Sequence, residues 1–442
     1  MVLIVVQFAL ATGVQAQVRH SIIAASGEAA PAGGNYGDFL NTIAVNARGQ
    51  VAFDVRLAGP STSGVFVSKG TTTSAIALGG NADPATGNFA FVSAPSLTTS
   101  GDVIFNTGTA IFRGNGKTNV PLVQDGDPAP GGGNLIVGGT GFNANSRGLI
   151  TFGTFVNGGI ATEGVFRTDS SHTIAIALDG TPSPTGGTFL FFSSPVIDEV
   201  GRVAFYAGMI GGSADYGIYR GDGENINTIF AANQIAPSGR TFLDFSDPLM
   251  NKHGHVLVLA QLDTGTGLFL HDGRDAVAIA LSGEPAPNGG NYSSFFGPLT
   301  LNDCGQTAFE ARLIGGSSGI FRADRTTITS IALKGTAAAG TTGTFDTFGD
   351  LQIGKDGSVV FIATLTIGVG GVDASNNVGI WIGTSETDLH LVARTSQSIA
   401  GKTLTRPLSL AQLNMDQHSI VWLGRFAGNA TALVSSDLDS NY

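Results

Sequence analysis

The stretch Asn46–Phe53, with the sequence NARGQVAF, decides the fold of this chain because it returns about every fifty residues. Residues 198–205 read DEVGRVAF, and residues 302–309 read NDCGQTAF. An eighth, degenerate copy ends in the sequence IVW at residues 420–422, with His418 at the glycine position. Weaker copies are centred on Gly101, Gly148, Gly254 and Gly357. Self-similarity at this period indicates a repeat architecture.

Each copy predicts a tight hairpin. The Asn or Asp at its first position can hydrogen-bond to the backbone of its own turn, and the Gly at its fourth position readily takes a left-handed conformation. The residues that follow, Val51–Phe53 in the first copy, are apolar without alternation. Such a run is typical of a strand that is covered on both faces.

Three further elements follow each hairpin in a fixed order. A Gly-aliphatic-aromatic strand such as Gly64–Phe66 comes first, and an Ile-Ala-Leu strand such as Ile76–Leu78 comes next. A loop rich in Pro and Gly, such as Gly283–Gly290, then ends the repeat. With the two hairpin strands this gives four strands per repeat. The sequence therefore predicts an all-β fold, an eight-bladed β-propeller of four-stranded antiparallel blades.

The two ends of the chain predict how the ring closes. A lone strand of the fourth type, His20–Ala25, precedes the first hairpin, whereas the last repeat stops after its third strand, Thr431–Val434. We expect the N-terminal strand to complete the last blade, which leaves no free sheet edge. An open solenoid with polar capping repeats and a pair of separate β domains are the alternatives.

The amino-acid composition is typical of an all-β protein and argues against nucleic acid as a partner. The chain has 65 Gly, 42% apolar residues and 12% charged residues, which favours short strands joined by Gly-rich turns and argues against disorder. The net charge is −11 and no basic cluster occurs, so no nucleic acid is expected as a partner. A single cysteine, Cys304, precludes an intrachain disulfide.

Residues 1–16 are predicted to be a secretory signal peptide. Residues 2–14 (VLIVVQFALATGV) are mostly apolar but too few to span a bilayer, and small residues lead up to Ala16. A buried first strand is the alternative interpretation. We expect residues 17–442 to form a single propeller domain, a monomer without an integral membrane segment. Its predicted location is extracellular, periplasmic or at the cell surface.

The Asn-x-x-Gly-x-x-Ala-Phe signature resembles that of the bacterial tandem-repeat proteins named for this motif, often called choice-of-anchor repeat proteins. The resemblance extends over nearly the whole chain after residue 16, because eight copies recur at regular spacing. It implies an exported, β-propeller-like protein that lies at the cell surface or outside the cell. It implies no particular chemistry.

One face of the predicted propeller is the candidate binding face. The loops between the second and third strands and the loops between blades meet there, whereas the Asn-x-x-Gly turns lie on the opposite face. Its longest insertions are residues 208–217 (GMIGGSADYG) and 368–378 (GVGGVDASNNV). These loops offer carboxylate, amide and aromatic groups suited to a glycan: Asp215, Tyr216, Asp373, Asn376 and Asn377. Solvated loops without a ligand are the alternative interpretation.

No metal site, cofactor site or catalytic motif is predicted. His253 and His255 flank a turn glycine, but the spacing of other residues supplies no third ligand. Neither a nucleophile elbow nor a phosphate loop occurs. The sequence thus favours a non-catalytic extracellular binding or surface scaffold protein for a glycan or a protein partner. The alternative is a polysaccharide lyase or glycoside hydrolase that uses carboxylates near the central channel.

Overall fold

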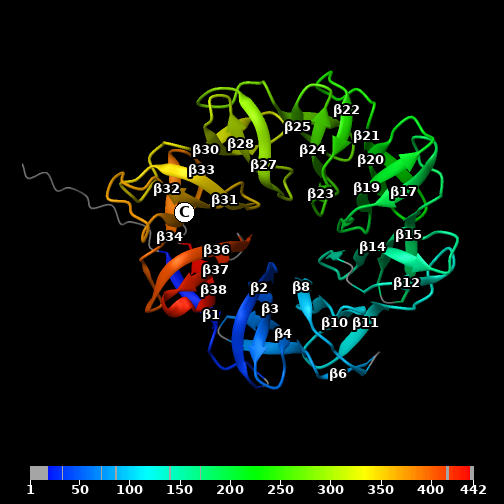
Figure 1. Ribbon diagram of the computed structural model, residues 1–442, viewed down its shortest axis with the longest axis horizontal. Coiled ribbons are helices and arrows are strands. Elements are labelled where there is room, and N and C mark those ends of the chain that lie inside the picture. Colours follow the sequence, from blue (N-terminus) through cyan, green and yellow to red (C-terminus); the bar gives the residue numbers. More distant parts are fainter. Residues whose placement is uncertain are drawn as a thin grey trace, which may run out of the picture.

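The computed structural model describes residues 18–438 apart from 32, 71, 85–86, 139–140, 170 and 415–417. Eight antiparallel sheets of four or five strands stand side by side in a ring, as Figure 1 shows. Each of these sheets is one blade, and in blades 1 to 7 the strands follow one another in chain order from the centre of the ring outward. The prediction of an eight-bladed β-propeller is confirmed.

Four blades contain four strands each, without a break in the innermost strand. Blade 1 contains β2 (Asn35–Val45), β3 (Gln50–Ala58), β4 (Ser63–Lys69) and β5 (Thr72–Leu78). Blade 2 contains β8 (Ser93–Leu97), β9 (Val103–Asn106), β10 (Ala110–Gly114) and β11 (Asn119–Gln124). Blade 6 contains β27 (Tyr292–Leu301), β28 (Thr307–Leu313), β29 (Ser318–Ala323) and β30 (Ile328–Leu333). Blade 7 contains β31 (Phe345–Ile353), β32 (Val359–Leu365), β33 (Val378–Ser385) and β34 (Asp388–Arg394).

In blades 3, 4 and 5 the innermost strand is split into two short strands that pair with the same neighbour. Blade 3 contains β12 (Asn134–Ile136), β13 (Phe142–Ala144), β14 (Ile150–Asn157), β15 (Glu163–Thr168) and β16 (Thr173–Leu178). Blade 4 contains β17 (Thr188–Phe192), β18 (Val196–Ile197), β19 (Val203–Ile210), β20 (Tyr216–Gly221) and β21 (Ile226–Ala231). Blade 5 contains β22 (Phe242–Phe245), β23 (Leu249–Met250), β24 (Val256–Leu262), β25 (Thr266–His271) and β26 (Ala276–Leu281). Pro195 and Pro248 lie at two of the splits, and proline has no amide hydrogen for the ladder.

Blade 8 closes the ring with strands from both ends of the chain. It contains β36 (Lys402–Asn414), β37 (Ser419–Phe426), β38 (Thr431–Asp437) and, outermost, β1 (Arg19–Ala25). β1 pairs antiparallel with β38, so that Ile22 lies opposite Val434 and Ala25 lies opposite Ala432. The predicted closure by the N-terminal strand is confirmed. The short strand β35 (Ser398–Ile399) pairs with β36 at the other edge of this sheet, and the 3₁₀ helix η2 (Ala427–Asn429) precedes β38. The short strands β6 (Ala82–Asp83) and β7 (Gly87–Asn88) pair with each other in the loop between blades 1 and 2.

The Asn-x-x-Gly turns have the predicted geometry and also join neighbouring blades. Asn46 accepts hydrogen bonds from the Arg48 and Gln50 amides at 3.0 and 3.1 Å, and Gly49 has a left-handed φ of 73°. The Asn46 amide nitrogen donates to the Thr98 carbonyl of blade 2 at 3.0 Å. Equivalent bonds run from Asn145 to Asp198, from Asn251 to Asn302 and from Asn302 to Gly354. These bonds between turns tie blades together on one face of the ring.

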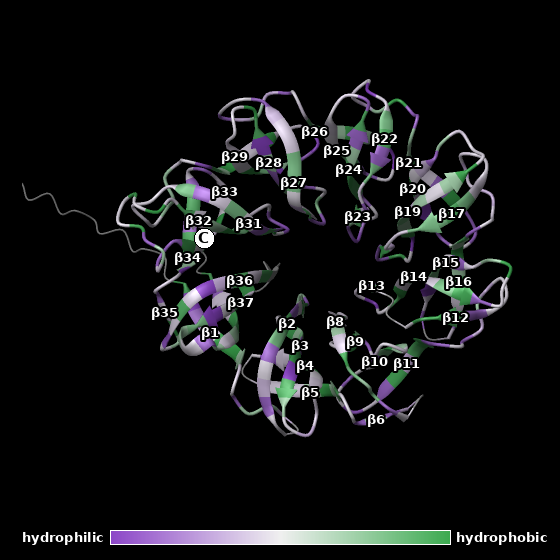
Figure 2. Ribbon diagram, viewed as in Figure 1, coloured by the Kyte–Doolittle hydropathy of each residue, from purple (hydrophilic) through white to green (hydrophobic). Residues whose placement is uncertain are grey.

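The hairpin strands are buried on both faces, as their continuous apolar run predicted. In β3 the exposed fraction is 0% for both Ala52 and Phe53. Ala52 packs in the cluster shared with blade 2, whereas Phe53 packs in the cluster shared with blade 8. Burial of a side chain such as Phe53 stabilises the fold by roughly 1.5–3 kcal/mol. Figure 2 shows that apolar segments recur in the strands of every blade.

The Gly-aliphatic-aromatic strand and the Ile-Ala-Leu strand form one packing unit. A Cβ atom on Gly64 would lie 2.5 Å from Cε2 of Phe66 and 3.0 Å from Cδ2 of Leu78. The aromatic ring therefore folds back over the glycine two residues earlier, and the leucine of the next strand covers both. Gly319 and Leu333 repeat this contact in blade 6, with a Cβ-to-Cδ2 distance of 2.4 Å.

The predicted signal peptide, residues 1–16, lies outside the described residues. The described part of the predicted domain, 17–442, forms the single ring of blades. No helix among the described residues is both long and apolar enough to cross a membrane.

Candidate binding face

The loops between second and third strands and the loops between blades contact one another on one face, here called the loop face. Arg240, in the loop that leads into β22, donates to the Thr264 carbonyl at 2.9 Å and to the Ser282 carbonyl at 3.2 Å. Thr264 lies between β24 and β25, and Ser282 begins the next loop between blades. Among the described residues, the exposed large apolar side chains lie at this face except for Val120 and Val200.

Three aromatic side chains form a shelf on blade 4, and "aromatic shelf" is used below for Phe191, Tyr206 and Tyr216. In the strand register, Gly208 of β19 lies opposite Phe191 of β17 on one side and opposite Tyr216 of β20 on the other. Tyr206 precedes Gly208 by two residues. Because side chains alternate between the two faces of a sheet, the three rings point to the same side of blade 4.

The rings of the shelf pack against one another and remain open to solvent. Tyr206 stacks on Tyr216 with ring centroids 6.1 Å apart and planes 16° apart, and Phe191 lies 6.2 Å from Tyr206. Phe191 is 38% exposed and Tyr216 is 37% exposed. A Cβ atom on Gly208 would lie 2.2 Å from Cε1 of Phe191, so the absence of a side chain at Gly208 makes room for this ring.

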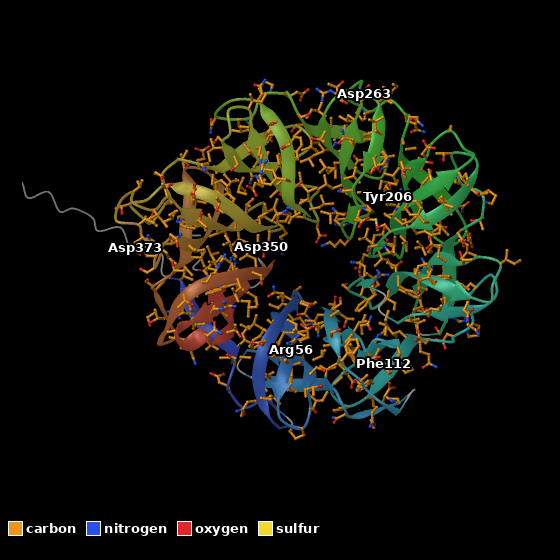
Figure 3. The ribbon with its side chains drawn as sticks, in the orientation of Figure 1. Arg56, Phe112, Tyr206, Asp263, Asp350 and Asp373 are labelled. Atoms are coloured by element: carbon orange, nitrogen blue, oxygen red, sulfur yellow. The ribbon has the colours of Figure 1, made fainter. Side chains whose placement is uncertain are left out.

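A carboxylate from the next blade holds the central ring of the shelf. The Tyr206 hydroxyl donates to Oδ1 of Asp244 at 2.9 Å, and the Phe245 amide donates to the same oxygen at 2.8 Å. Burial, together with the hydrogen bond to Asp244, raises the pKa of Tyr206, so its hydroxyl stays protonated and donates. The shelf therefore lies where blade 4 meets blade 5, and Figure 3 places Tyr206 on the side of blade 4 that faces the centre of the ring.

The structure separates the two predicted insertions. Tyr216 belongs to the shelf, and Asp215, which is exposed, accepts the Met209 amide through its carbonyl at 2.8 Å. Asp373 lies on blade 7, and Figure 3 shows it far from Tyr206, at the opposite side of the ring.

Hydrogen bonds inside the blade 7 insertion engage the side chains of Asp373 and Asn376 and the main chain of Asn377. Asp373 accepts the Ser375 hydroxyl at 2.6 Å and the Ser375 amide at 2.8 Å, and these bonds lower the pKa of the Asp373 carboxyl. The Asn376 side-chain oxygen accepts a hydrogen bond from Arg394 at 3.0 Å. The Asn377 carbonyl accepts the Leu365 amide at 2.7 Å. These contacts shape the loop itself and bring no aromatic ring to it.

Sequence reasoning missed Phe191, Tyr206 and Asp244, although one signal was present. Tyr206 directly follows the phenylalanine of its repeat, and this position faces the cleft to the next blade. The residue there changes chemistry from blade to blade, unlike the apolar residues before it: Asp54, Asn106, Gly153, Tyr206, Leu259, Glu310, Ile362 and Leu423. The sequence signal for the site was therefore the chemical variation at this one position of an otherwise regular repeat, since its side chains lie between neighbouring blades.

Two of these cleft positions hold buried carboxyl groups. Asp54 is 2% exposed and accepts the Ala94 amide of blade 2 at 2.9 Å. Glu310 is 5% exposed on β28. Burial raises the pKa of both carboxyl groups to about 7.

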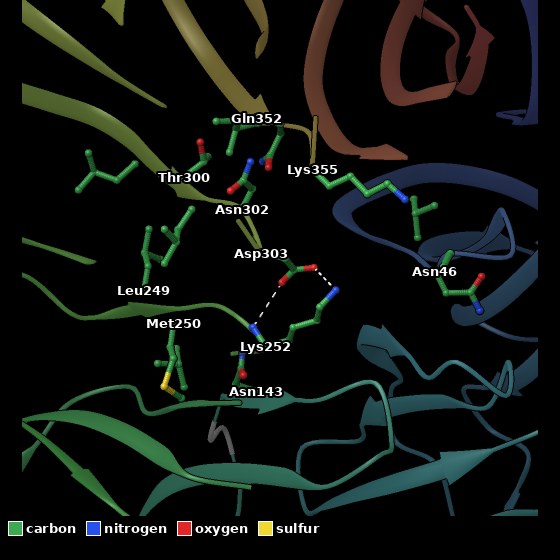
Figure 4. Close-up of a pocket in the computed structure, with 16 residues that line it drawn as sticks. Asn46, Asn143, Leu249, Met250, Lys252, Thr300, Asn302, Asp303, Gln352 and Lys355 are labelled. Carbon is green, nitrogen blue, oxygen red and sulfur yellow. Dashed lines mark hydrogen bonds and ion pairs between the residues drawn. The ribbon is translucent and has the colours of Figure 1, made fainter. Parts of the chain in front are cut away.

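A cavity of about 620 Å³ lies at the centre of the ring, where several Asn-x-x-Gly turns meet, as Figure 4 shows. Lys252 and Asp303 form an ion pair across it with an N–O distance of 2.6 Å. Asp303 is the one carboxylate among the described residues that line the cavity. No group of three or more His, Cys, Asp or Glu side chains suited to a metal ion occurs in the described part of the chain.

The chain is similar to several solved structures at low sequence identity. The β-propeller domain of the Trilobed protease from Pyrococcus furiosus is 10% identical, with a TM-score of 0.45, over 82% of this chain and 100% of that chain. The WD40 domain of SCAP from fission yeast is 11% identical, with a TM-score of 0.46, over 96% and 95% of the two chains. The polysaccharide lyase Uly1 is 9% identical, with a TM-score of 0.41, over 96% and 99%.

No curated protein matches the chain. The model of a family of unknown function, DUF7453, matches residues 6–274 and again residues 264–437. The chain therefore belongs to this family.

Proposed function

We propose that this member of DUF7453 is an exported, non-catalytic binding protein that recognises a glycan through the aromatic shelf. The carrying observation is the arrangement of Phe191 and Tyr216, two half-exposed rings that flank Tyr206 beside the carboxylate of Asp244. An aromatic ring covers the apolar C–H face of a sugar, and a neighbouring carboxylate accepts its hydroxyl groups. Because strand pairing and the bond to Asp244 already fix the rings, little conformational entropy is lost on binding.

The polar groups near the shelf support a glycan as the ligand. Asp215 precedes Tyr216 and is exposed, and Asp247 is exposed beyond Asp244 at the same cleft. Carboxylates are strong acceptors for hydroxyl donors. A sugar has hydroxyl groups around the edge of an apolar ring face. Its ring face can therefore stack on an aromatic side chain while its hydroxyl groups donate to the neighbouring carboxylates.

The central cavity supports binding rather than catalysis. Hydrolysis of a glycosidic bond generally uses two carboxyl groups roughly 5 to 9.5 Å apart. Among the described lining residues the cavity offers Asp303, whose carboxylate is paired with Lys252 at 2.6 Å. The shelf, which lies on blade 4, is the better-equipped site for a sugar.

A glycan array tests this function. The full chain is applied to immobilised polysaccharides and oligosaccharides beside Tyr216→Ala and a matched control, Phe91→Ala. Phe91 is 45% exposed on the same face, and its ring covers Gly108 as Phe191 covers Gly208, but the residue equivalent to Tyr206 there is Asn106. We expect Tyr216→Ala to weaken glycan binding by about tenfold, because it removes a stacking ring, and Phe91→Ala to leave binding unchanged.

Assays for reducing ends and unsaturated products on the same polysaccharides complete the test. Binding without turnover supports the proposal. Cleavage of any bound polysaccharide, equal losses in the two variants, or no glycan binding at all would contradict it.

A further inference from the structure

We propose that the glycan site continues from the aromatic shelf into the neighbouring cleft between blades 3 and 4, so that the ligand is a polysaccharide chain rather than a single terminal sugar. This inference rests on the proposed glycan-binding function and names the length of the ligand. Blade 4 separates the two places: the shelf lies on its side toward blade 5, and a cavity lies on its side toward blade 3.

The second cleft is lined by a glycine at the position where blade 4 has a tyrosine. A cavity of about 330 Å³ lies there, and its lining includes Gly153, Phe155, Glu163 and Phe192. Gly153 occupies the repeat position that Tyr206 occupies in blade 4. The nearest atom to a Cβ built on Gly153 is Cδ of Pro195, at 3.7 Å, so a side chain can begin here without a clash and would extend toward the cavity that Gly153 lines.

A single strand, β17, forms the wall between the two clefts. Phe191 and Phe192 are successive residues of β17, and successive side chains of a strand point to opposite faces. Phe191 belongs to the shelf, whereas Phe192 lines the second cleft and is held by Phe189 at a centroid distance of 5.5 Å. Leu190, which is 53% exposed, directly precedes them at a bulge of the same strand. A linear ligand that crosses β17 at this exposed point contacts both sides of blade 4.

The second cleft repeats the chemistry of the first. Phe155 is 63% exposed at its lining, which gives a free ring face for a second sugar. Glu163 accepts the Phe192 amide through Oε1 at 3.1 Å, which directs its carboxylate into the cleft. The hydroxyl-bearing Ser193 and Ser194 also line it. One exposed ring beside one fixed carboxylate is the same combination that Tyr216 and Asp244 provide.

Calorimetry with oligosaccharides of increasing length tests the inference. The probes are β-1,4-linked glucose, xylose, mannose and N-acetylglucosamine oligomers of one to six units, together with the polysaccharides bound on the array. For the parent chain we expect affinity to rise at least tenfold from short to long oligomers, because the two clefts act together on one ligand. Gly153→Leu, which fills the second cleft, and Phe155→Ala are each expected to abolish this rise.

The outcomes separate this inference from the proposed function. Tyr216→Ala should weaken binding of every length, and Phe91→Ala should change nothing; thermal unfolding shows whether each variant is folded. If short and long oligomers bind equally and Gly153→Leu binds like the parent, the second cleft is not a subsite, although the shelf still binds sugar. If no oligomer and no polysaccharide binds, the proposed function itself fails. A protein partner captured through Phe155 would overturn the inference as well.

Discussion

The two faces of this propeller use their polar groups in opposite ways. On the turn face, buried asparagines such as Asn302 direct their hydrogen bonds to the backbone of their own turn and of the next blade. On the loop face, Phe191 and Tyr216 remain half-exposed beside carboxylates. Both faces have hydrogen bonds between blades, but those of the turn face repeat from blade to blade, whereas those of the loop face, such as the bond from Tyr206 to Asp244, are particular to one pair of blades. The irregular face can therefore carry a site at one place in the ring.

The largest expected effect is on the turn face. Asn302→Ala removes bonds to the Gly354 carbonyl and to Gln306 Oε1, both at 2.8 Å, and bonds from the Cys304 and Gln306 amides at 3.0 and 2.9 Å. Because Asn302 is buried, the groups left behind lose their partners, and we expect a loss of about 3 kcal/mol in the free energy of unfolding. Chemical denaturation measures it.

Asn302→Asp is the matched control. It keeps both acceptor bonds within the turn but cannot donate to Gly354, so about half of the loss should remain. Blade 4 has Asp198 at this position, and there Arg202 donates to the His253 carbonyl of the next blade at 3.0 Å instead. If Asn302→Asp is as stable as the parent chain, the bonds between blades do not stabilise the ring.

The next largest effect is expected inside a blade. A methyl group on Gly319 would lie 2.4 Å from Cδ2 of Leu333 and 2.9 Å from the Ala332 carbonyl oxygen. Gly319→Ala therefore forces two buried strands apart, and overpacking of this kind costs about 2 kcal/mol. Gly335→Ala, at an open turn with no atom within 4 Å, is a control that tests φ strain alone. A Gly319→Ala chain with unchanged unfolding would show that Leu333 and the backbone at Ala332 can move away from the new methyl group without loss of stability.

The fold was predictable to a greater extent than the site. The residues that determine a turn lie close together in the sequence, so Asn46 and Gly49 predict their hairpin from one short stretch. Because the same pattern recurs in other repeats, the prediction of the whole fold is stronger than that of any one turn. The site joins Phe191, Tyr206 and Asp244 from three strands of two blades. Their proximity depends on strand register, including a bulge between Phe189 and Phe191, and sequence spacing alone does not contain that register.

A pH effect is expected at the clefts of the loop face. Burial raises the pKa of Glu310 from 4.5 to about 7, so between these values the unfolded chain has released a proton that the folded chain still holds. This group therefore favours folding at low pH, and its contribution is lost as the pH rises through about 7. Glu310→Gln should match the parent chain at low pH and exceed its stability at pH 8, by on the order of 1 kcal/mol.

Thermal unfolding across the pH range checks this prediction. Asp54→Asn should behave in the same way, because its side-chain oxygen still accepts the Ala94 amide. Parallel pH profiles for Glu310→Gln and the parent chain would mean that Glu310 is ionised in the folded protein.

The smallest effect is expected at the turn position next to the asparagine. Lys252 pairs with Asp303 at 2.6 Å, but the two side chains are 50% and 37% exposed, so water and salt screen their attraction. Lys252→Ala should change the free energy of unfolding by less than about 0.5 kcal/mol, at low and at high salt. Asn302 and Lys252, from equivalent turns of neighbouring blades, would then differ severalfold in their contribution because Asn302 is buried and Lys252 is not. If Lys252→Ala lowers the free energy of unfolding as much as Asn302→Ala does, ion pairs at the central cavity contribute as much to the stability of the turn face as the buried asparagine side chains do.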